Sequence, residues 1–310
     1  MLSAAQIQER ETGIGGSDIA AVLGLDRFRQ PYDVWAEKVG LTPREEAELL
    51  SDDPRFWGHH LEQPIAEAYA KRASEARGEP VKVRRVNQTR RHPEYPWLVA
   101  NIDRDVVGER RGLEIKNVTP WLRSAWGDEG TDEAADYYVP QAHHYLLVLD
   151  YDRWDLAAYF GGADLRVYHF LRSREFDELI IERTHAFWHD HVLAGEPPPF
   201  DFEFQHAERT LEQLYPGVNA RKVVQLGDRG QVLADALELA RAHRLNAEKL
   251  EQAAKNEIRF LIGDAGAGVL PDGTCFVRRK IQRKGQVVAP SDYIELRHRD
   301  ELPGPKKENR

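Results

Sequence analysis

The sequence predicts an α/β fold in which a central mixed β-sheet is flanked by helices. Segments with the apolar spacing of amphipathic helices alternate with short runs of strand-like composition. The predicted order is helices, a three-stranded meander, a helix, a strand pair and a further helix, which is typical of one mixed sheet with helices on its faces. The 310 residues suffice for one large domain or for a domain with an appendage.

The predicted helices before the sheet cover residues 3–11, 19–23, 31–39 and 56–73. Ser3 with Gln6 resembles a capping box for the first helix, and Ser17 or Asp18 can cap the second. An acidic connector over residues 41–55 precedes the fourth helix. Pro64 must lie near the first turn of that helix or bend it, because proline removes a backbone donor.

The predicted strands cover residues 81–90, 97–107, 112–118, 153–160 and 164–171. Between the third and fourth strands, a helix is predicted from Pro140, a favoured first helical residue, to Leu149. A helix over residues 175–193 ends before Gly195 and a run of prolines. These elements complete a predicted sheet domain over residues 1–205.

Residues 206–310 are predicted to form a separate extension with a long helix and a β-hairpin. Residues 230–262 have helical composition and an apolar stripe. A glycine-rich turn over residues 263–273 follows, and residues 274–283 and 286–296 are predicted to pair as a hairpin.

The composition excludes several classes of protein. No apolar run of about 18 residues is present, so no membrane partner is expected. The N-terminus lacks the layout of a signal peptide, and a cytoplasmic location is expected. Cys275 is the single cysteine, which excludes an internal disulfide and a cysteine-rich metal site. The net charge of −9 disfavours non-specific coating of DNA, although basic runs give local positive charge.

The most informative motif is Leu113-Glu114-Ile115-Lys116, together with Asp103 on the preceding strand. Side chains alternate along a strand, so Glu114 and Lys116 share one face while their neighbours can pack into a core. Two carboxylates can hold Mg²⁺ beside a phosphate, and a lysine can position water or offset developing charge. The pattern therefore indicates a metal-dependent nuclease, although an isolated Glu-x-Lys pair is more often a solvated charge pair.

Five sequence blocks appear in order around this motif: residues 13–24, Gly58 with Leu61-Glu62, residues 100–103, 113–116 and 140–145. Their order and spacing resemble the YqaJ-like viral recombinase family, relatives of phage lambda exonuclease within the PD-(D/E)xK nuclease superfamily. The resemblance implies a restriction-endonuclease-like core. It also implies a phage or prophage exonuclease that degrades linear double-stranded DNA 5′ to 3′ for recombination.

The resemblance also implies roles for individual residues. Asp103, Glu114 and the backbone carbonyl of Ile115 would ligate the metal, and Glu62 would bind it directly or through water. Oxygen ligands of this kind suit Mg²⁺ or Mn²⁺ rather than zinc. Asp105 shares the strand face of Asp103 and is a rival ligand.

Two further residues belong to the implied catalytic set. Lys116 would orient the attacking water or stabilise the transition state. Gln141 would contact the scissile region or the lysine, and it lies one helical turn before Tyr145. Aromatic residues between Lys116 and Gln141, among them Tyr138, can stack on bases or pack in the core.

The residues expected to contact DNA are Arg10, Ser17, Asp18, Tyr145, Arg278, Arg279 and Lys280. In the block Gly15-Gly16-Ser17-Asp18, small residues let the backbone approach a phosphate; the alternative is a plain helix cap. Arg10 resembles an arginine that receives a 5′-phosphate, and the alternative is a solvated side chain. The basic run that contains Arg278 is either a DNA or partner contact or a solvated edge strand.

The resemblance further implies two kinds of partner besides DNA ends. Relatives work beside a single-strand annealing protein, and some form ring-shaped trimers. Two other functions remain open from the sequence. One is an endonuclease or defence nuclease on the same fold, and the other is a catalytically idle DNA-binding accessory protein.

Overall fold

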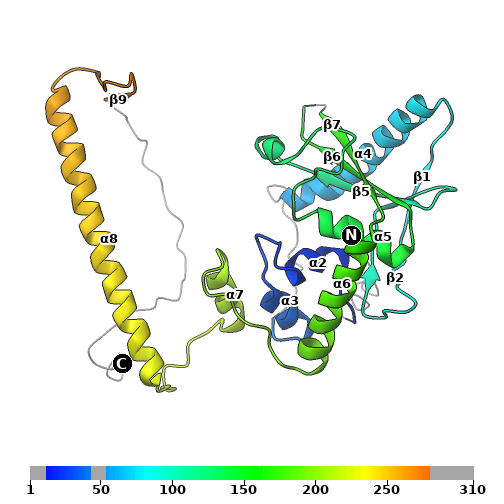
Figure 1. Cartoon of the computed structure of the whole chain (residues 1–310), viewed down its shortest axis with the longest axis horizontal. Coiled ribbons are helices and arrows are strands. Elements are labelled where there is room, and N and C mark those ends of the chain that lie inside the picture. The colour runs from blue at the N-terminus through cyan, green and yellow to red at the C-terminus, as the bar shows by residue number, and fades with distance from the viewer. Residues whose placement is uncertain (1–11, 43–53, 163, 280–310) are drawn as a thin grey trace, which may run out of the picture. The chain divides into compact units, whose positions relative to one another are not determined.

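The computed structural model describes residues 12–42, 54–162 and 164–279 (Figure 1). The chain forms two compact units, Met1–Pro216 and Gly217–Arg310. The first unit extends a little beyond the boundary placed after residue 205 from the sequence, and it includes α7 (Ala207–Leu214). The hydroxyl of Thr210 on α7 donates to Asp33 Oδ1 at 2.5 Å, which links this helix to the rest of the first unit.

A five-stranded mixed sheet in the order β1-β4-β5-β6-β7 forms the centre of the first unit. The strands are β1 (Val83–Arg85), β4 (Arg104–Val106), β5 (Arg111–Asn117), β6 (Arg153–Tyr159) and β7 (Leu165–Leu171). β5 and β6 run parallel, and the other neighbours are antiparallel. The predicted α/β class, with a central mixed sheet flanked by helices, is confirmed.

Two predicted strands differ from the structure. The strand predicted over residues 97–107 is interrupted: β3 (Val99–Ala100) pairs with β2 (Arg90–Arg91) in a separate two-stranded sheet. β4 begins only at Arg104. The strand predicted over residues 81–90 likewise divides between β1 and β2. Asp103 therefore lies in the break between β3 and β4 rather than within a strand.

Helices cover both faces of the sheet. α4 (Pro54–Arg77) packs on β5 and β6 from one side, and Ile65 and Tyr69 of this helix join Leu113 and Ile115 in one apolar cluster. α5 (Val139–Leu149) packs on β6 and β7 through the larger cluster that contains Trp154. Side-chain alternation along the strands separates these two clusters.

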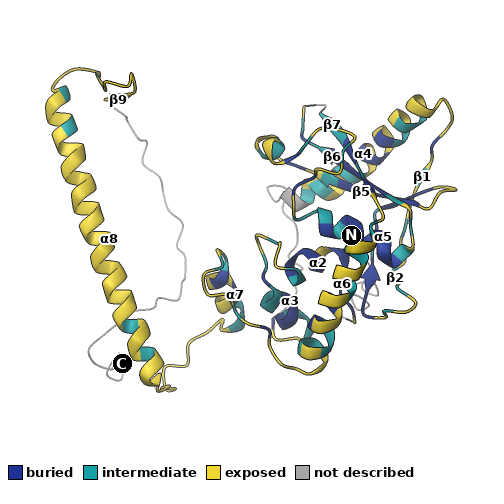
Figure 2. Ribbon diagram, in the orientation of Figure 1, coloured by how far each residue is buried: buried dark blue, intermediate teal, exposed yellow. Residues whose placement is uncertain are grey.

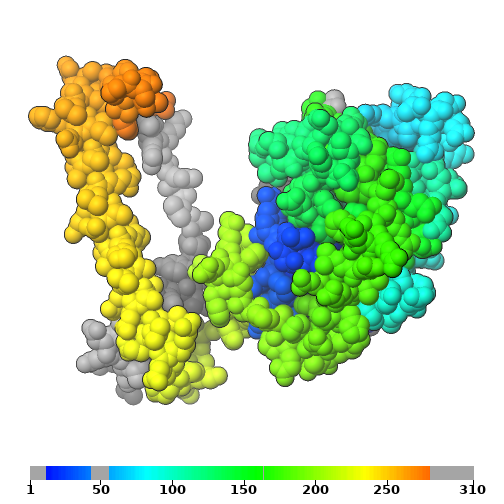
Figure 3. Space-filling model, viewed as in Figure 1, coloured from blue at the N-terminus to red at the C-terminus, as the bar shows by residue number. Residues whose placement is uncertain are grey.

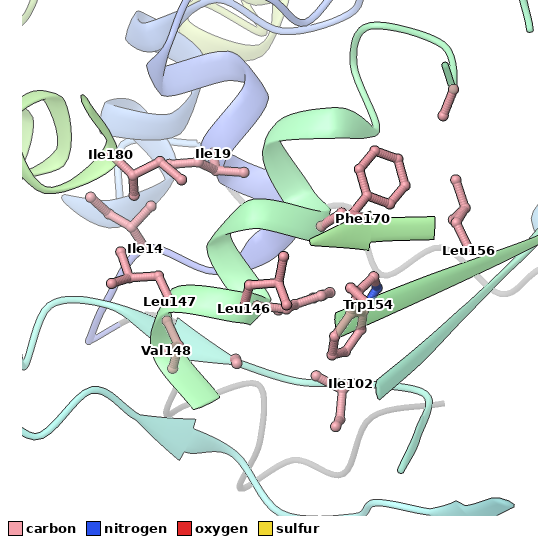
Figure 4. Close-up of a cluster of buried hydrophobic side chains, with 14 of the residues drawn as sticks. Ile14, Ile19, Ile102, Leu146, Leu147, Val148, Trp154, Leu156, Phe170 and Ile180 are labelled. Carbon is pink, nitrogen blue, oxygen red and sulfur yellow. The ribbon is translucent and has the colours of Figure 1, made fainter. Parts of the chain in front are cut away.

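The remaining helices of the first unit enlarge the cluster on the α5 side. They are α2 (Gly16–Val22), α3 (Pro31–Lys38), η1 (Pro120–Ala125), α6 (Arg174–Ala186) and the π-helical η2 (Phe187–Leu193), which continues α6. Figure 4 shows Ile14, Ile19 and Ile180 together in this cluster. Figure 2 shows that the buried residues are concentrated in the sheet and the helices around it.

Local sequence patterns placed most helix boundaries well, with two corrections. Pro64 lies inside α4, well beyond its first turn. α2 begins at Gly16, earlier than predicted, because Asp18 is the third residue of the helix and accepts a hydrogen bond from the Gly15 N–H at 3.2 Å. The predicted helix over residues 3–11 and most of the predicted connector lie outside the described residues.

The second unit contains α8 (Gly227–Ile262), β8 (Ala267–Val269) and β9 (Cys275–Val277). β9 pairs with β8, so the segment predicted as a glycine-rich turn supplies a strand. The strand predicted over residues 286–296 lies outside the described residues. No residue of α8 is buried, and the space-filling view shows this helix as a single rod (Figure 3). Within residues 12–42, 54–162 and 164–279, no helix has the length and apolar character needed to span a membrane.

Candidate active site

Glu114 and Lys116 of β5 form the centre of the candidate site. They lie on the α5 side of the sheet, as the strand alternation predicted, and Lys116 Nζ is 2.6 Å from Glu114 Oε1. Gln141 on α5 donates from Nε2 to the same Glu114 oxygen at 2.9 Å. Two donors from different elements therefore hold one oxygen of this carboxylate in place.

Asp103 is brought to the same place by the break between β3 and β4. Its Oδ2 accepts a hydrogen bond from the Ile115 N–H at 2.9 Å, which fixes the carboxylate next to β5. Burial, followed by the charge of Glu114, raises the pKa of Asp103 to about 8. The two carboxyl groups thus lie close enough for the charge of Glu114 to disfavour ionisation of Asp103.

Lys116 supplies the compensating positive charge. Burial by itself would lower the pKa of this lysine, but Glu114 and further neighbours outweigh burial and raise it, so the side chain stays protonated. The ring of Tyr138 lies 5.1 Å from Lys116 Nζ in a cation–π contact. From the sequence, Tyr138 is one of several aromatic residues before Gln141, because no local pattern places its ring over the lysine.

Tyr145 supports the site from behind. Its hydroxyl donates to the Asn101 carbonyl at 2.9 Å and accepts a hydrogen bond from Gln141 Nε2 at 3.0 Å. The side chain is 4% exposed, and a DNA contact by Tyr145 stays a prediction. Tyr145 links Gln141 to the segment that precedes Asp103.

The donor set fits a divalent cation. Glu114 Oε2 is buried and has no hydrogen-bond partner, while the other oxygen of the same group is held by Lys116 and Gln141. An unpartnered carboxylate oxygen beside a second carboxylate is a suitable ligand for a hard cation such as Mg²⁺ or Mn²⁺. Within the part of the chain that the structure describes, no three His, Cys, Asp or Glu side chains form a metal site by themselves. The fit therefore rests on Asp103, Glu114 and the Ile115 carbonyl.

Glu62 and Asp105 are engaged by other residues. Glu62 on α4 forms an ion pair with Arg104, which also donates to Gln63 Oε1 at 3.0 Å and to the Asp103 carbonyl at 2.8 Å. A metal contact by Glu62 stays a prediction. Asp105 accepts hydrogen bonds from Arg84 at 3.1 Å and Tyr151 at 2.8 Å, so its carboxylate is less available than that of Asp103.

The predicted DNA-contacting residues have different positions. Asp18 is fully buried and paired with Lys38 at 2.9 Å and with Arg29 at 3.0 Å, so its carboxylate joins α2 to α3 and the segment before it, and a DNA contact stays a prediction. Ser17 is exposed on α2. Arg278 and Arg279 are exposed after β9 in the second unit, and Arg10 and Lys280 lie outside the described residues.

These observations define a mixed α/β protein with a carboxylate–lysine cluster on a central strand. The family model of the YqaJ-like viral recombinase domain matches residues 7–152 of the sequence. The uncharacterized protein YqaJ of Bacillus subtilis (strain 168) is 30% identical over 264 residues, which are 84% of this chain and 79% of that protein. The chain belongs to the YqaJ-like viral recombinase family, as the motif blocks predicted.

Solved structures with a similar fold include an alkaline exonuclease (LHK-Exo) from Laribacter hongkongensis. Its TM-score is 0.48 at 17% sequence identity, and the match covers 69% of this chain and 100% of that chain. A phage-related exonuclease from Haemophilus somnus 129PT has a TM-score of 0.41 at 15% identity, covering 59% of this chain and 96% of that chain.

Proposed function

We propose that this chain is a metal-dependent DNA exonuclease that hydrolyses linear double-stranded DNA from its 5′ ends during phage-type recombination. The observation that supports the proposal is that the two carboxylate oxygens of Glu114 have different surroundings. One oxygen is held by Lys116 and Gln141, and the other is buried without a partner beside Asp103. Membership in a family described as viral recombinases supports the recombination role.

The residues divide the chemistry as follows. Asp103, Glu114 and the Ile115 carbonyl would hold Mg²⁺, with Mn²⁺ as a substitute. The cation would supply positive charge at the scissile phosphate and make a nearby water more acidic. Lys116 keeps its proton, positions the attacking water and offsets the negative charge that develops on the phosphate. Gln141 keeps the Glu114 carboxylate in one orientation.

An exposed aromatic and cationic cluster lies beside this site. The Arg27 guanidinium is 4.6 Å from the Phe28 ring centroid and 4.9 Å from that of Tyr137. The Tyr137 ring packs at 4.4 Å against Tyr138, the residue that covers Lys116. Arginine and aromatic groups together suit phosphate contact and base stacking. We assign DNA contact near the site to this cluster.

Two further proposals come from the family resemblance. The active form would be a homo-oligomer such as a ring-shaped trimer, and a single-strand annealing protein would receive the DNA strand that remains. Light scattering of the purified chain tests the first, and co-purification with the annealing protein tests the second.

The deciding experiment compares the wild-type protein, Lys116→Ala and the control Lys71→Ala with Mg²⁺ on three DNAs. Lys71 is a 78% exposed lysine on α4. The substrates are linear DNA with a 5′-phosphate, linear DNA with a 5′-hydroxyl, and covalently closed circular DNA. We expect degradation of the linear forms, preferentially the phosphorylated one, by wild type and Lys71→Ala but not by Lys116→Ala.

Other outcomes would replace the proposal. Cutting of the closed circle would identify an endonuclease. Binding of DNA without cleavage, with either Mg²⁺ or Mn²⁺, would identify a recombination accessory protein.

A further inference from the structure

A second pocket lies on the opposite face of the sheet from the candidate active site. It has a volume of about 300 Å³ between α4 and strands β5, β6 and β7. Its polar lining consists mainly of four arginine side chains, Arg72, Arg77, Arg111 and Arg153, with His169 and the single carboxylate Asp155. A volume of this size suits a small ligand.

The pocket is separate from the candidate site. Arg111 and Glu114 lie three positions apart on β5, so their side chains leave opposite faces of the strand. Leu113 and Ile115 extend the Arg111 face toward Tyr69 in the apolar cluster under α4. This cluster fills the α4 face between the pocket and the end of β5 that carries Lys116.

Asp155 is paired with residues of the pocket itself. Its carboxylate accepts from Tyr69 at 2.5 Å and from Arg153 at 2.7 Å, His169 Nδ1 lies 2.8 Å away, and Arg111 lies 3.5 Å away. The pKa of Asp155 is lowered, because these contacts outweigh burial. With Glu109 and Glu129 beside the lining, three carboxylates face four guanidinium groups, so the excess is one positive charge.

Three of the guanidinium groups are paired with carboxylates outside the lining. Arg72 is paired with Glu129 at 2.7 Å, and Arg77 and Arg111 are paired with Glu109 at 2.6 Å and 3.2 Å. Each guanidinium carries five N–H donors, more than one such ion pair uses.

Arg111 is the most buried of the four arginines, at 4% exposed. Its Nε lies 3.2 Å from Glu109 Oε2 and its Nη1 lies 3.5 Å from Asp155 Oδ2. These carboxylates hold its guanidinium in the lining of the pocket.

We propose that this pocket binds a phosphate group, either as inorganic phosphate or as the phosphoryl end of a mononucleotide. Arginine forks match the geometry of phosphate oxygens and bind them in pairs. The proposal stands independently of the exonuclease function, since none of the pocket residues belongs to the Asp103–Glu114–Lys116 cluster.

Isothermal titration calorimetry in phosphate-free, metal-free buffer tests whether the pocket binds phosphate, with inorganic phosphate and dAMP as the probes. The test variant is Arg72→Gln/Arg77→Gln, because both side chains are partly exposed, at 46% and 36%, and the substitutions should leave the fold intact. The matched control is Arg174→Gln, whose side chain is 91% exposed on α6. Circular dichroism checks that all variants fold.

We expect saturable binding by the wild type and by Arg174→Gln, and at least tenfold weaker binding by the double variant. Equal affinities for both probes would identify the phosphoryl group as the whole ligand, and tighter dAMP binding would identify a mononucleotide. The proposal is overturned if neither probe binds saturably or if the double variant binds as well as wild type. It is also overturned if Lys116→Ala abolishes binding, because the phosphate then occupies the candidate active site.

Discussion

The ring of Tyr145 lies against the backbone of Gly16: a β-carbon at Gly16 would fall 2.4 Å from Tyr145 Cζ. Glycine at this position lets α2 approach α5, and Tyr145 in turn binds Gln141 and the Asn101 carbonyl. The small residues of the block Gly15-Gly16-Ser17-Asp18 predict room for the backbone to approach a DNA phosphate. The structure gives a different reason for Gly16, because the space is filled by a residue that supports the candidate site.

We expect Gly16→Ala to lower the free energy of unfolding by about 1–3 kcal/mol, the usual cost of forcing an extra carbon into a packed interior. Urea unfolding followed by circular dichroism measures this. The control is Gly58→Ala on α4, where a β-carbon meets nothing within 4 Å and helix propensity should keep or increase stability. A Gly16→Ala protein as stable as wild type would contradict the packing argument.

Asp103 and Asp105 form a matched pair for testing the metal site. Asp103→Asn should reduce cleavage by on the order of a hundredfold or more, because it removes a carboxylate that would hold the cation. Asp105→Asn should cleave DNA at nearly the wild-type rate and lose about 1–3 kcal/mol of stability, because Asp105 binds Arg84 and Tyr151. Cleavage assays and urea unfolding separate the two effects. The reverse pattern would make Asp105 the ligand.

Gln141→Met should keep the fold and lower the cleavage rate about 10–100-fold, the usual effect of removing a group that orients a metal ligand. Methionine fills a similar volume but cannot donate to Glu114, which the native amide contacts at 2.9 Å. Single-turnover kinetics with saturating Mg²⁺ provides the measurement. Tyr145→Phe should produce a smaller loss, since Gln141 keeps its bond to Glu114. An unchanged rate in Gln141→Met would show that Lys116 alone suffices to hold the carboxylate.

Arg27→Ala should weaken DNA binding similarly for all sequences and reduce the slope of log affinity against log salt by about 1, as expected for one lost phosphate contact. Fluorescence anisotropy with a labelled duplex in Ca²⁺ measures binding without relying on cleavage. Arg174→Ala is the control, because this arginine lies on α6 and is 91% exposed. Equal salt slopes for the two variants would remove Arg27 from the DNA path.

Two buried histidines should make the fold sensitive to acid. Burial lowers the pKa of His143 and His144 to about 4 each. His144 donates from Nε2 to the Val99 carbonyl at 2.8 Å, and its Nδ1 is buried without a partner, so a second proton has no acceptor there. The unfolded chain binds this proton near pH 6.5. The contribution to stability is therefore complete above pH 6.5 and is lost as pH falls toward 4.

Between pH 6.5 and 4, the free energy of unfolding should fall by up to about 1.4 kcal/mol per pH unit for each histidine. Urea unfolding at pH 7.5, 6.5 and 5.5 measures it. His144→Gln, whose side-chain amide can still donate to Val99, should show a smaller slope than wild type. The explanation fails if the two proteins lose stability equally over this range.

The sequence by itself determined the features that depend on local periodicity. Strand alternation placed Glu114 and Lys116 on one face, and the helical spacing placed Gln141 next to Tyr145. The sheet strands 111–117, 153–159 and 165–171 match their predicted positions closely, because apolar residues recur within each strand and turn residues lie beside it.

Only the tertiary structure decided features that depend on partners distant in sequence. The break before Arg104, which brings Asp103 to the Ile115 N–H, appears only when β3 pairs with β2. Aspartate is a residue type typical of exposed helix caps, yet Asp18 lies in the interior, where it pairs with Lys38 and Arg29. The local spacing of apolar and polar residues predicts which face of a strand or helix a side chain occupies. The group that packs against that face comes from another part of the chain.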